Sequence, residues 1–234
     1  MMYDPHAVLA AMDANKWGVI AFCGAAMLFN YTWFYQAVRQ GLRDRVFPLP
    51  ISNILFWLCG DGTGVSRFDM YFNQYAHWYL ELFWCALVFT VSFEIIFIWM
   101  TLKFGREELA PDWSQGQFTA LIVAAAAIFA ITWHMVLQAM PDDLNIVYFN
   151  IANMAGPIAM AGLILRRKSI AGTTSTIWIN YALMLTCWYI AQALWFGAEF
   201  RTPAMLAFMV INIGAAAALA VHIRQREQRA GTAG

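Results

Sequence analysis

Six apolar stretches, each long enough to cross a lipid bilayer, restrict the possible folds of this chain more than any other feature. The hydrocarbon core of a bilayer is ~30 Å thick and needs about 20 apolar residues in a spanning helix. Only 12% of the residues are charged, whereas soluble domains carry about 25%. The sequence therefore predicts an all-α, multi-pass integral protein of the plasma or inner membrane. The stretches are 17 to 38, 77 to 102, 118 to 140, 146 to 165, 177 to 200 and 203 to 222.

A seventh stretch, residues 47 to 59, is shorter than a usual span, and the basic residues decide how to interpret it. Lys and Arg accumulate in the cytoplasmic loops of membrane proteins. If this stretch crosses, completed by less apolar residues from 46 to 63, eleven of the 14 basic residues fall on one side. The pattern predicts seven transmembrane helices, with the N-terminus outside and the C-terminus in the cytoplasm. The eleven are Arg39, Arg43, Arg45, Lys103, Arg106, Arg166, Arg167, Lys168, Arg224, Arg226 and Arg229; the other three are Lys16, Arg67 and Arg201.

The loops between the stretches are short, and the longest are 60 to 76 and 103 to 117. We therefore expect a single seven-helix transmembrane domain over 1–234. It would have a short extracytoplasmic N-terminus at 1–16 and a basic cytoplasmic tail at 223–234 that forms a frayed helix end. The net charge is zero and the basic residues are spread over the loops, so no nucleic-acid partner is expected.

The four cysteines and four histidines give no pattern of metal ligands. The cysteines lie inside apolar stretches without CxxC spacing, where they act as small apolar residues, and the histidines are scattered along the chain. We expect no metal and no cofactor, and the oligomeric state stays open.

Two glutamates inside the stretch from 77 to 102 are the most unusual residues of the sequence. A charged carboxylate near the bilayer centre costs at least ~2.5 kcal/mol of free energy. Such a group must therefore be paired with another group, be protonated or have a function. Glu81 follows His77 by one turn on the same helix face, and the two could share a proton. Glu94 lies roughly 20 Å deeper on a nearly opposite face. Glu81 is therefore the candidate proton donor, and Glu94 is expected to be a neutral structural acid.

With the predicted helix directions, polar residues from several helices fall at the outer level of Glu81. Asp61 ends the short second helix and His134 lies in the outer third of the fourth. The candidate catalytic residues are therefore Glu81, Asp61, His134 and His77. A solvated carboxylate at a helix end is the alternative for Asp61, as for Asp142, Asp143 and Glu199.

Tryptophans spread through the spans, and amide side chains in their outer parts, are candidates for substrate binding. Tryptophan rings can line a cavity for a lipophilic or cationic molecule. The alternatives are packing between helices and interhelical hydrogen bonds, worth ~0.6 to 2 kcal/mol each. The candidates are Trp57, Trp84, Trp133, Asn150, Asn153, Trp188 and Gln192.

Three segments resemble, in order, the signatures of the integral-membrane terpene cyclases of fungal meroterpenoid and indole-diterpene pathways. They are NYTWFYQAVRQGLRDRVFPLPISNILFW, HWYLELFW and LILRRKSIAGTTSTIW, and the resemblance covers about half of the chain. It implies seven helices and cyclisation started by an acid. The family's acid in helix two is replaced by Trp57 or Leu58, and helix seven carries Asn212 and no acid. Asp61, one turn further along, would substitute for the acid in helix two. Glu81 occupies the position of the family's acid in helix three.

Two functions stay open. One is a membrane-embedded enzyme that isomerises or cyclises a lipophilic, isoprenoid-like substrate, with Glu81 as acid and His77 or His134 relaying the proton. The other is a non-catalytic carrier or accessory subunit that binds lipid or a partner helix. The expected partners are accordingly a lipophilic small molecule and membrane lipid.

Overall fold

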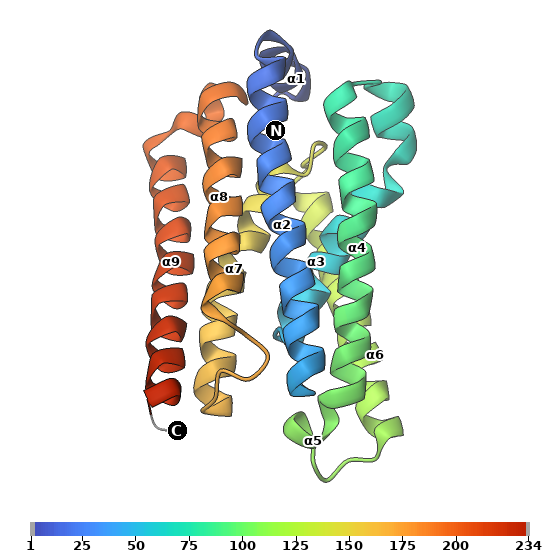
Figure 1. Ribbon diagram of the computed structural model, residues 1–234. Coiled ribbons are helices and arrows are strands. Elements are labelled where there is room, and N and C mark those ends of the chain that lie inside the picture. Colours follow the sequence, from blue (N-terminus) through green and yellow to red (C-terminus); the bar gives the residue numbers. More distant parts are fainter. Residues whose placement is uncertain (1–2, 233–234) are drawn as a thin grey trace. The chain divides into compact units, whose positions relative to one another are not determined.

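The computed structural model describes residues 3–232 (Figure 1). Between residues 3 and 232 the chain is 85% helical and has no strand. Six helices are long and apolar enough to cross a membrane, which confirms the prediction of an all-helical chain with several such segments. They are α2 (Lys16–Asp44), α4 (Trp78–Phe104), α6 (Gln115–Ala139), α7 (Ile146–Arg167), α8 (Ser175–Trp195) and α9 (Pro203–Thr232).

The short seventh stretch forms a helix, α3 (Ile51–Ser66), with bounds other than those predicted. The predicted start at 46 is wrong because Pro48 and Pro50 precede the helix, and a proline disfavours helical backbone in the residue before it. The helix also continues past Thr63 to Ser66. The π-helix η1 (Met70–Gln74) then occupies part of the predicted loop, so the connection to α4 is more ordered than the sequence indicates.

The chain divides into two compact units. Unit 1 contains the residues up to 36 and from 174 onward, and unit 2 contains residues 37–173. Helix α2 contributes its first part to unit 1 and its last part to unit 2. The single seven-helix domain stays a prediction.

Unit 1 contains α1 (Pro5–Ala14), the 3-10 helix η2 (Ala198–Arg201) and the neighbouring helices α8 and α9 (Figure 1). The carboxylate of Glu227 in α9 accepts hydrogen bonds from the backbone N–H and the hydroxyl of Ser175, at 3.0 and 2.7 Å. It thereby caps the first turn of α8. Helix α9 continues to Thr232, and Glu227 joins it to α8; the frayed end of the cytoplasmic tail stays a prediction.

In unit 2, helix α3 packs against α4, α6 and α7. Two glycines allow the close approach: Gly60 faces the ring of Tyr148, and Gly64 faces Leu87. The outer face of α6 leaves Val123, Ile128, Ile131 and Met135 more than 60% exposed. Such a continuous apolar face on a long helix is typical of contact with lipid.

A network around Arg167 joins the short helix α5 (Arg106–Leu109) to two connecting segments of unit 2. Arg167 Nη2 lies 2.8 Å from Glu108 Oε2. The same guanidinium donates to the carbonyl oxygens of Phe47 and Ala171, at 3.2 and 2.7 Å. The end of α7 is therefore fixed to the segments before α3 and before α8.

Candidate functional site

Two buried carboxyl groups, Asp61 of α3 and Glu94 of α4, form the centre of the candidate site. Asp61 is 4% exposed and Glu94 is 0% exposed. The two carboxyl groups are direct neighbours, yet within residues 3–232 neither oxygen of Glu94 makes a hydrogen bond of acceptable geometry. Buried polar atoms without partners are uncommon and costly, so this pair is an exception that needs a physical reason.

Tyr148 of α7 forms the third side of this site. Its ring packs on Gly60, where an added Cβ would lie 1.6 Å from the tyrosine Cζ. Its hydroxyl donates to the carbonyl oxygens of Phe56 and Trp57, both at 3.0 Å. Cys59 of α3 lies near Glu94 and Tyr148. We call Cys59, Asp61, Glu94 and Tyr148 the acid cluster.

The acid cluster depends on how α7 begins. Asp142 is buried, and its two carboxylate oxygens accept from the N–H groups of Ile146 and Tyr148, at 3.2 and 2.7 Å. Arg67 donates to the carbonyl oxygen of Asp142 at 2.6 Å. Tyr71 lies near Arg67 and Asp142, and burial raises the pKa of its hydroxyl to about 12. The expectation of solvated carboxylates at Asp61 and Asp142 is therefore wrong, because one lies in the acid cluster and the other caps a helix.

Glu81 and His77 lie at the start of α4. Glu81 is half-buried in the first turn, where the helix dipole stabilises a negative charge. His77 is the N-cap residue, and its Nδ1 accepts from the N–H of Tyr79 at 3.2 Å. The predicted common level of Asp61 and Glu81 is wrong: Asp61 neighbours Glu94, roughly three and a half turns further along α4. The reason is that α3 continues to Ser66 before the chain turns.

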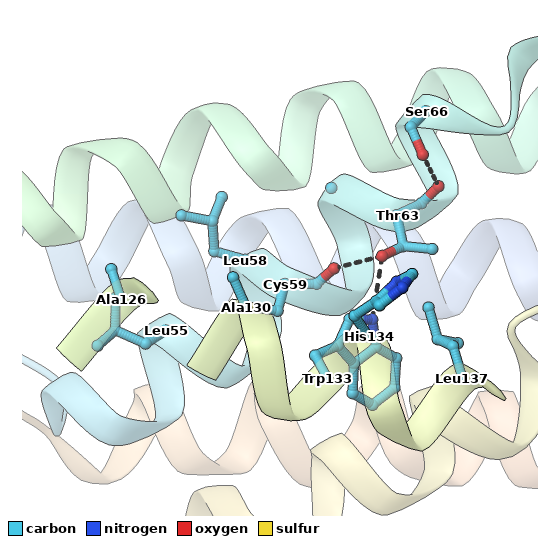
Figure 2. Close-up of a pocket in the computed structure, with 11 residues that line it drawn as sticks. Leu55, Leu58, Cys59, Thr63, Ser66, Ala126, Ala130, Trp133, His134 and Leu137 are labelled. Atoms are coloured by element: carbon cyan, nitrogen blue, oxygen red, sulfur yellow. Dashed lines mark hydrogen bonds between the residues drawn. The ribbon is translucent and has the colours of Figure 1, made fainter. Parts of the chain in front are cut away.

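A pocket of ≈ 480 Å³ lies between α3 and α6 (Figure 2). Trp133 Nε1 donates to the hydroxyl of Thr63 at 3.0 Å, and that hydroxyl donates to the carbonyl oxygen of Cys59 at 2.7 Å. The carboxyl-bearing residues Asp61 and Glu94 do not line the pocket, but Cys59 belongs to both the pocket and the acid cluster. The lining residues are Leu55, Leu58, Cys59, Gly62, Thr63, Ser66, Ala126, Ala130, Trp133, His134 and Leu137.

The other candidate residues in unit 2 contribute to packing contacts. Trp57 Nε1 donates to the carbonyl oxygen of Ala152 in α7 at 3.0 Å, and Trp84 Nε1 donates to that of Val65 in α3 at 2.8 Å. These bonds join α3 to α7 and α4. Asn150 and Asn153 are buried in α7, and Trp188 and Gln192 are buried in α8 of unit 1.

The sequence assigned no functional role to Glu94, Tyr148 or Cys59. Glu94 lies in the most apolar part of its stretch, and the segment CGDG around Asp61 places small residues on either side of an acid. Both features indicated an acid in a closely packed region.

Within residues 3–232 no group of three or more His, Cys, Asp or Glu side chains could hold a metal ion. No protein-family model matches the chain, and no match is found among curated proteins or solved structures.

Proposed function

We propose that this protein is a membrane-embedded enzyme that isomerises or cyclises a lipophilic, isoprenoid-like substrate by donating a proton from the Asp61–Glu94 pair. The observation that carries the proposal is the burial of two neighbouring carboxyl groups. Two adjacent carboxylates cannot both be ionised at low free energy in apolar surroundings, so one proton stays on the pair. A protonated carboxyl group in a water-poor site is the form that a general acid requires.

This proposal moves the donor role from Glu81 to the pair. In the reaction, the acid proton forms a C–H bond with an alkene carbon of the substrate, and the resulting carbocation rearranges. Loss of a proton from a neighbouring carbon to the carboxylate restores the acid. The resemblance to the integral-membrane terpene cyclases supports the substrate class, and the shared position of Cys59 gives the pocket a common wall with the acid cluster.

Solvent deuterium tests this chemistry directly. The purified protein is incubated in D2O with farnesyl- and geranylgeranyl-bearing alcohols, and deuterium in the recovered lipids is measured by mass spectrometry. We expect Glu94→Gln to lower the rate of incorporation by about 10² or more, the usual contribution of a general acid. Glu81→Gln is the matched control and should keep the wild-type rate.

The opposite pattern, with Glu81→Gln inactive and Glu94→Gln active, would return the donor role to Glu81. If the wild-type protein incorporates no deuterium into any of these alcohols, the proposed enzyme is wrong.

A carrier is the second candidate, because the carboxyl groups do not line the pocket. Buried acids within membrane helices also serve as proton sites in transporters. A carrier exposes such a site alternately to the two sides. Labelling of a cysteine introduced at Ser66, with membrane-impermeant maleimide added from each side, should then change when lipid is supplied. Unchanged labelling under all conditions would count against a carrier.

We also propose that α3 crosses the membrane, which gives seven spans, an external N-terminus and a cytoplasmic C-terminus in the plasma or inner membrane. The strict alternation of basic residues supports this topology. A reporter fused after Arg229 should be cytoplasmic, one at Gln74 external and one at Arg43 cytoplasmic. An external signal at Arg43 would remove α3 as a span.

A further inference from the structure

The pocket between α3 and α6 runs along the two helices and has two different ends. Its lining runs from Leu55 to Ser66 on α3 and from Ala126 to Leu137 on α6, and the two series run the same way. Figure 2 shows Leu55 and Ala126 at one end and Ser66 and Leu137 at the other. Each series rises about 16 Å along its helix. The pocket is therefore elongated along the helix axes.

Its polar groups gather at one end. Leu55, Leu58, Ala126 and Ala130 line one half, while Thr63, Ser66 and His134 line the other. No lining residue carries a permanent charge. A ligand matched to this pocket is uncharged, with an apolar chain and one polar head. The volume of ≈ 480 Å³ falls within the usual range of small-molecule sites, about 300–1,000 Å³.

The hydrogen bonds at the polar end favour a hydroxyl head. Gln138 Nε2 lies 3.1 Å from His134 Nε2, and because an amide nitrogen only donates, the ring accepts there and carries its proton on Nδ1 when neutral. The hydroxyl of Ser66 donates to the carbonyl oxygen of Thr63 at 2.7 Å, so its oxygen can still accept. The neutral His134 ring thus offers a donor and the Ser66 hydroxyl offers an acceptor, and a single alcohol group can pair with both.

We propose that this pocket binds a neutral single-chain lipid alcohol, with its hydroxyl between Ser66 and His134 and its chain along Leu58 and Ala130 toward Leu55. The site does not depend on the acid chemistry, because the Asp61 and Glu94 carboxyl groups are not part of its lining. It would hold a lipid beside Cys59 of the acid cluster in the proposed enzyme, or serve a carrier as a lipid site.

The test uses a farnesol analogue bearing a diazirine and an alkyne, with the protein in phosphatidylcholine nanodiscs. Labelled peptides are mapped by mass spectrometry, and unlabelled farnesol is the competitor. We expect labels within residues 55–66 and 126–137. Gly62→Leu should remove most of this labelling, because a Cβ at Gly62 meets nothing within 4 Å and the new side chain fills the pocket. Gly162→Leu in α7 also has open space and is the matched control that keeps wild-type labelling.

The head group is tested by the double variant Ser66→Ala/His134→Phe. It should weaken farnesol competition about tenfold, as expected for two lost hydrogen bonds, and should leave a probe without the hydroxyl unaffected. Equal labelling by both probes in the wild-type protein would contradict the proposed preference for an alcohol head group. Labelling that survives Gly62→Leu would contradict the proposed location of the binding site. Farnesol that fails to compete against phosphatidylcholine would assign the pocket to bulk acyl chains. Glu94→Gln should bind normally, which separates this outcome from failure of the proposed enzyme.

Discussion

Replacing Gly60 by alanine is expected to destabilise unit 2 by about 3 kcal/mol or more, near the upper end for overpacked cores. The new Cβ would lie 1.6 Å from Cζ of Tyr148. The ring cannot move aside easily, because its hydroxyl is bonded to two carbonyl oxygens of α3 and it contacts the rings of Phe56 and Trp133. Either α3 and α7 separate, or Tyr148 loses both hydrogen bonds.

Gly62→Ala, two residues further along the same helix, is the matched control. Nothing lies within 4 Å of its Cβ position, so alanine should stabilise α3 by about 0.5–1 kcal/mol through its higher helix propensity. Thermal unfolding of both variants in the same detergent measures the difference. Equal melting temperatures would show that Tyr148 does not pack on Gly60 as described.

Glu94→Leu is expected to stabilise the protein while abolishing deuterium incorporation. The carboxyl group is fully buried without a geometrically acceptable hydrogen bond, and it neighbours a second acid rather than a base. Replacing a buried ion pair by apolar residues of similar volume often stabilises a protein by about 1–4 kcal/mol, and a buried carboxyl group without a hydrogen bond carries a comparable desolvation cost. Leucine also removes the acid next to Asp61. We therefore expect the free energy of unfolding to rise by an amount in this range.

Phe97→Leu is the control for this variant. Phe97 is fully buried in the same helix, and its truncation should lower the unfolding free energy because it leaves a cavity. Urea or thermal unfolding, measured beside the deuterium assay, separates the two effects. A destabilised Glu94→Leu would mean that the carboxyl group is a structural element, and the proposed donor would lose its main support.

The six long helices were predictable because the bilayer fixes both their length and their composition. The ends were less predictable. Two prolines moved the start of α3 to Ile51, and α9 is joined to α8 through Glu227, whose partner Ser175 lies in another helix. A bond between distant residues leaves no local pattern in the sequence.

The site was predicted less well, because α4 is apolar on all sides. A helix without a polar face gives no indication of its rotation, so the sequence could not show that Glu94, rather than Glu81, faces Asp61. The depth of Asp61 also depended on where α3 ends. Gly60 did indicate a close contact, since a glycine inside a helix often marks the close approach of another part of the chain. Only the structure shows that the approaching group is the ring of Tyr148.

The length of α3 has a consequence for the surrounding membrane. Its 16 residues cover about 24 Å, less than the ~30 Å hydrocarbon core, whereas the neighbouring α6 has 25 residues. If α3 crosses, the bilayer beside it must thin locally, or water must follow its ends inward. Asp61 lies only five residues before the end of α3, so the thickness of the host bilayer would determine how far the buried acid pair is from water. Lipids with shorter acyl chains would then fit this protein better than lipids with longer ones.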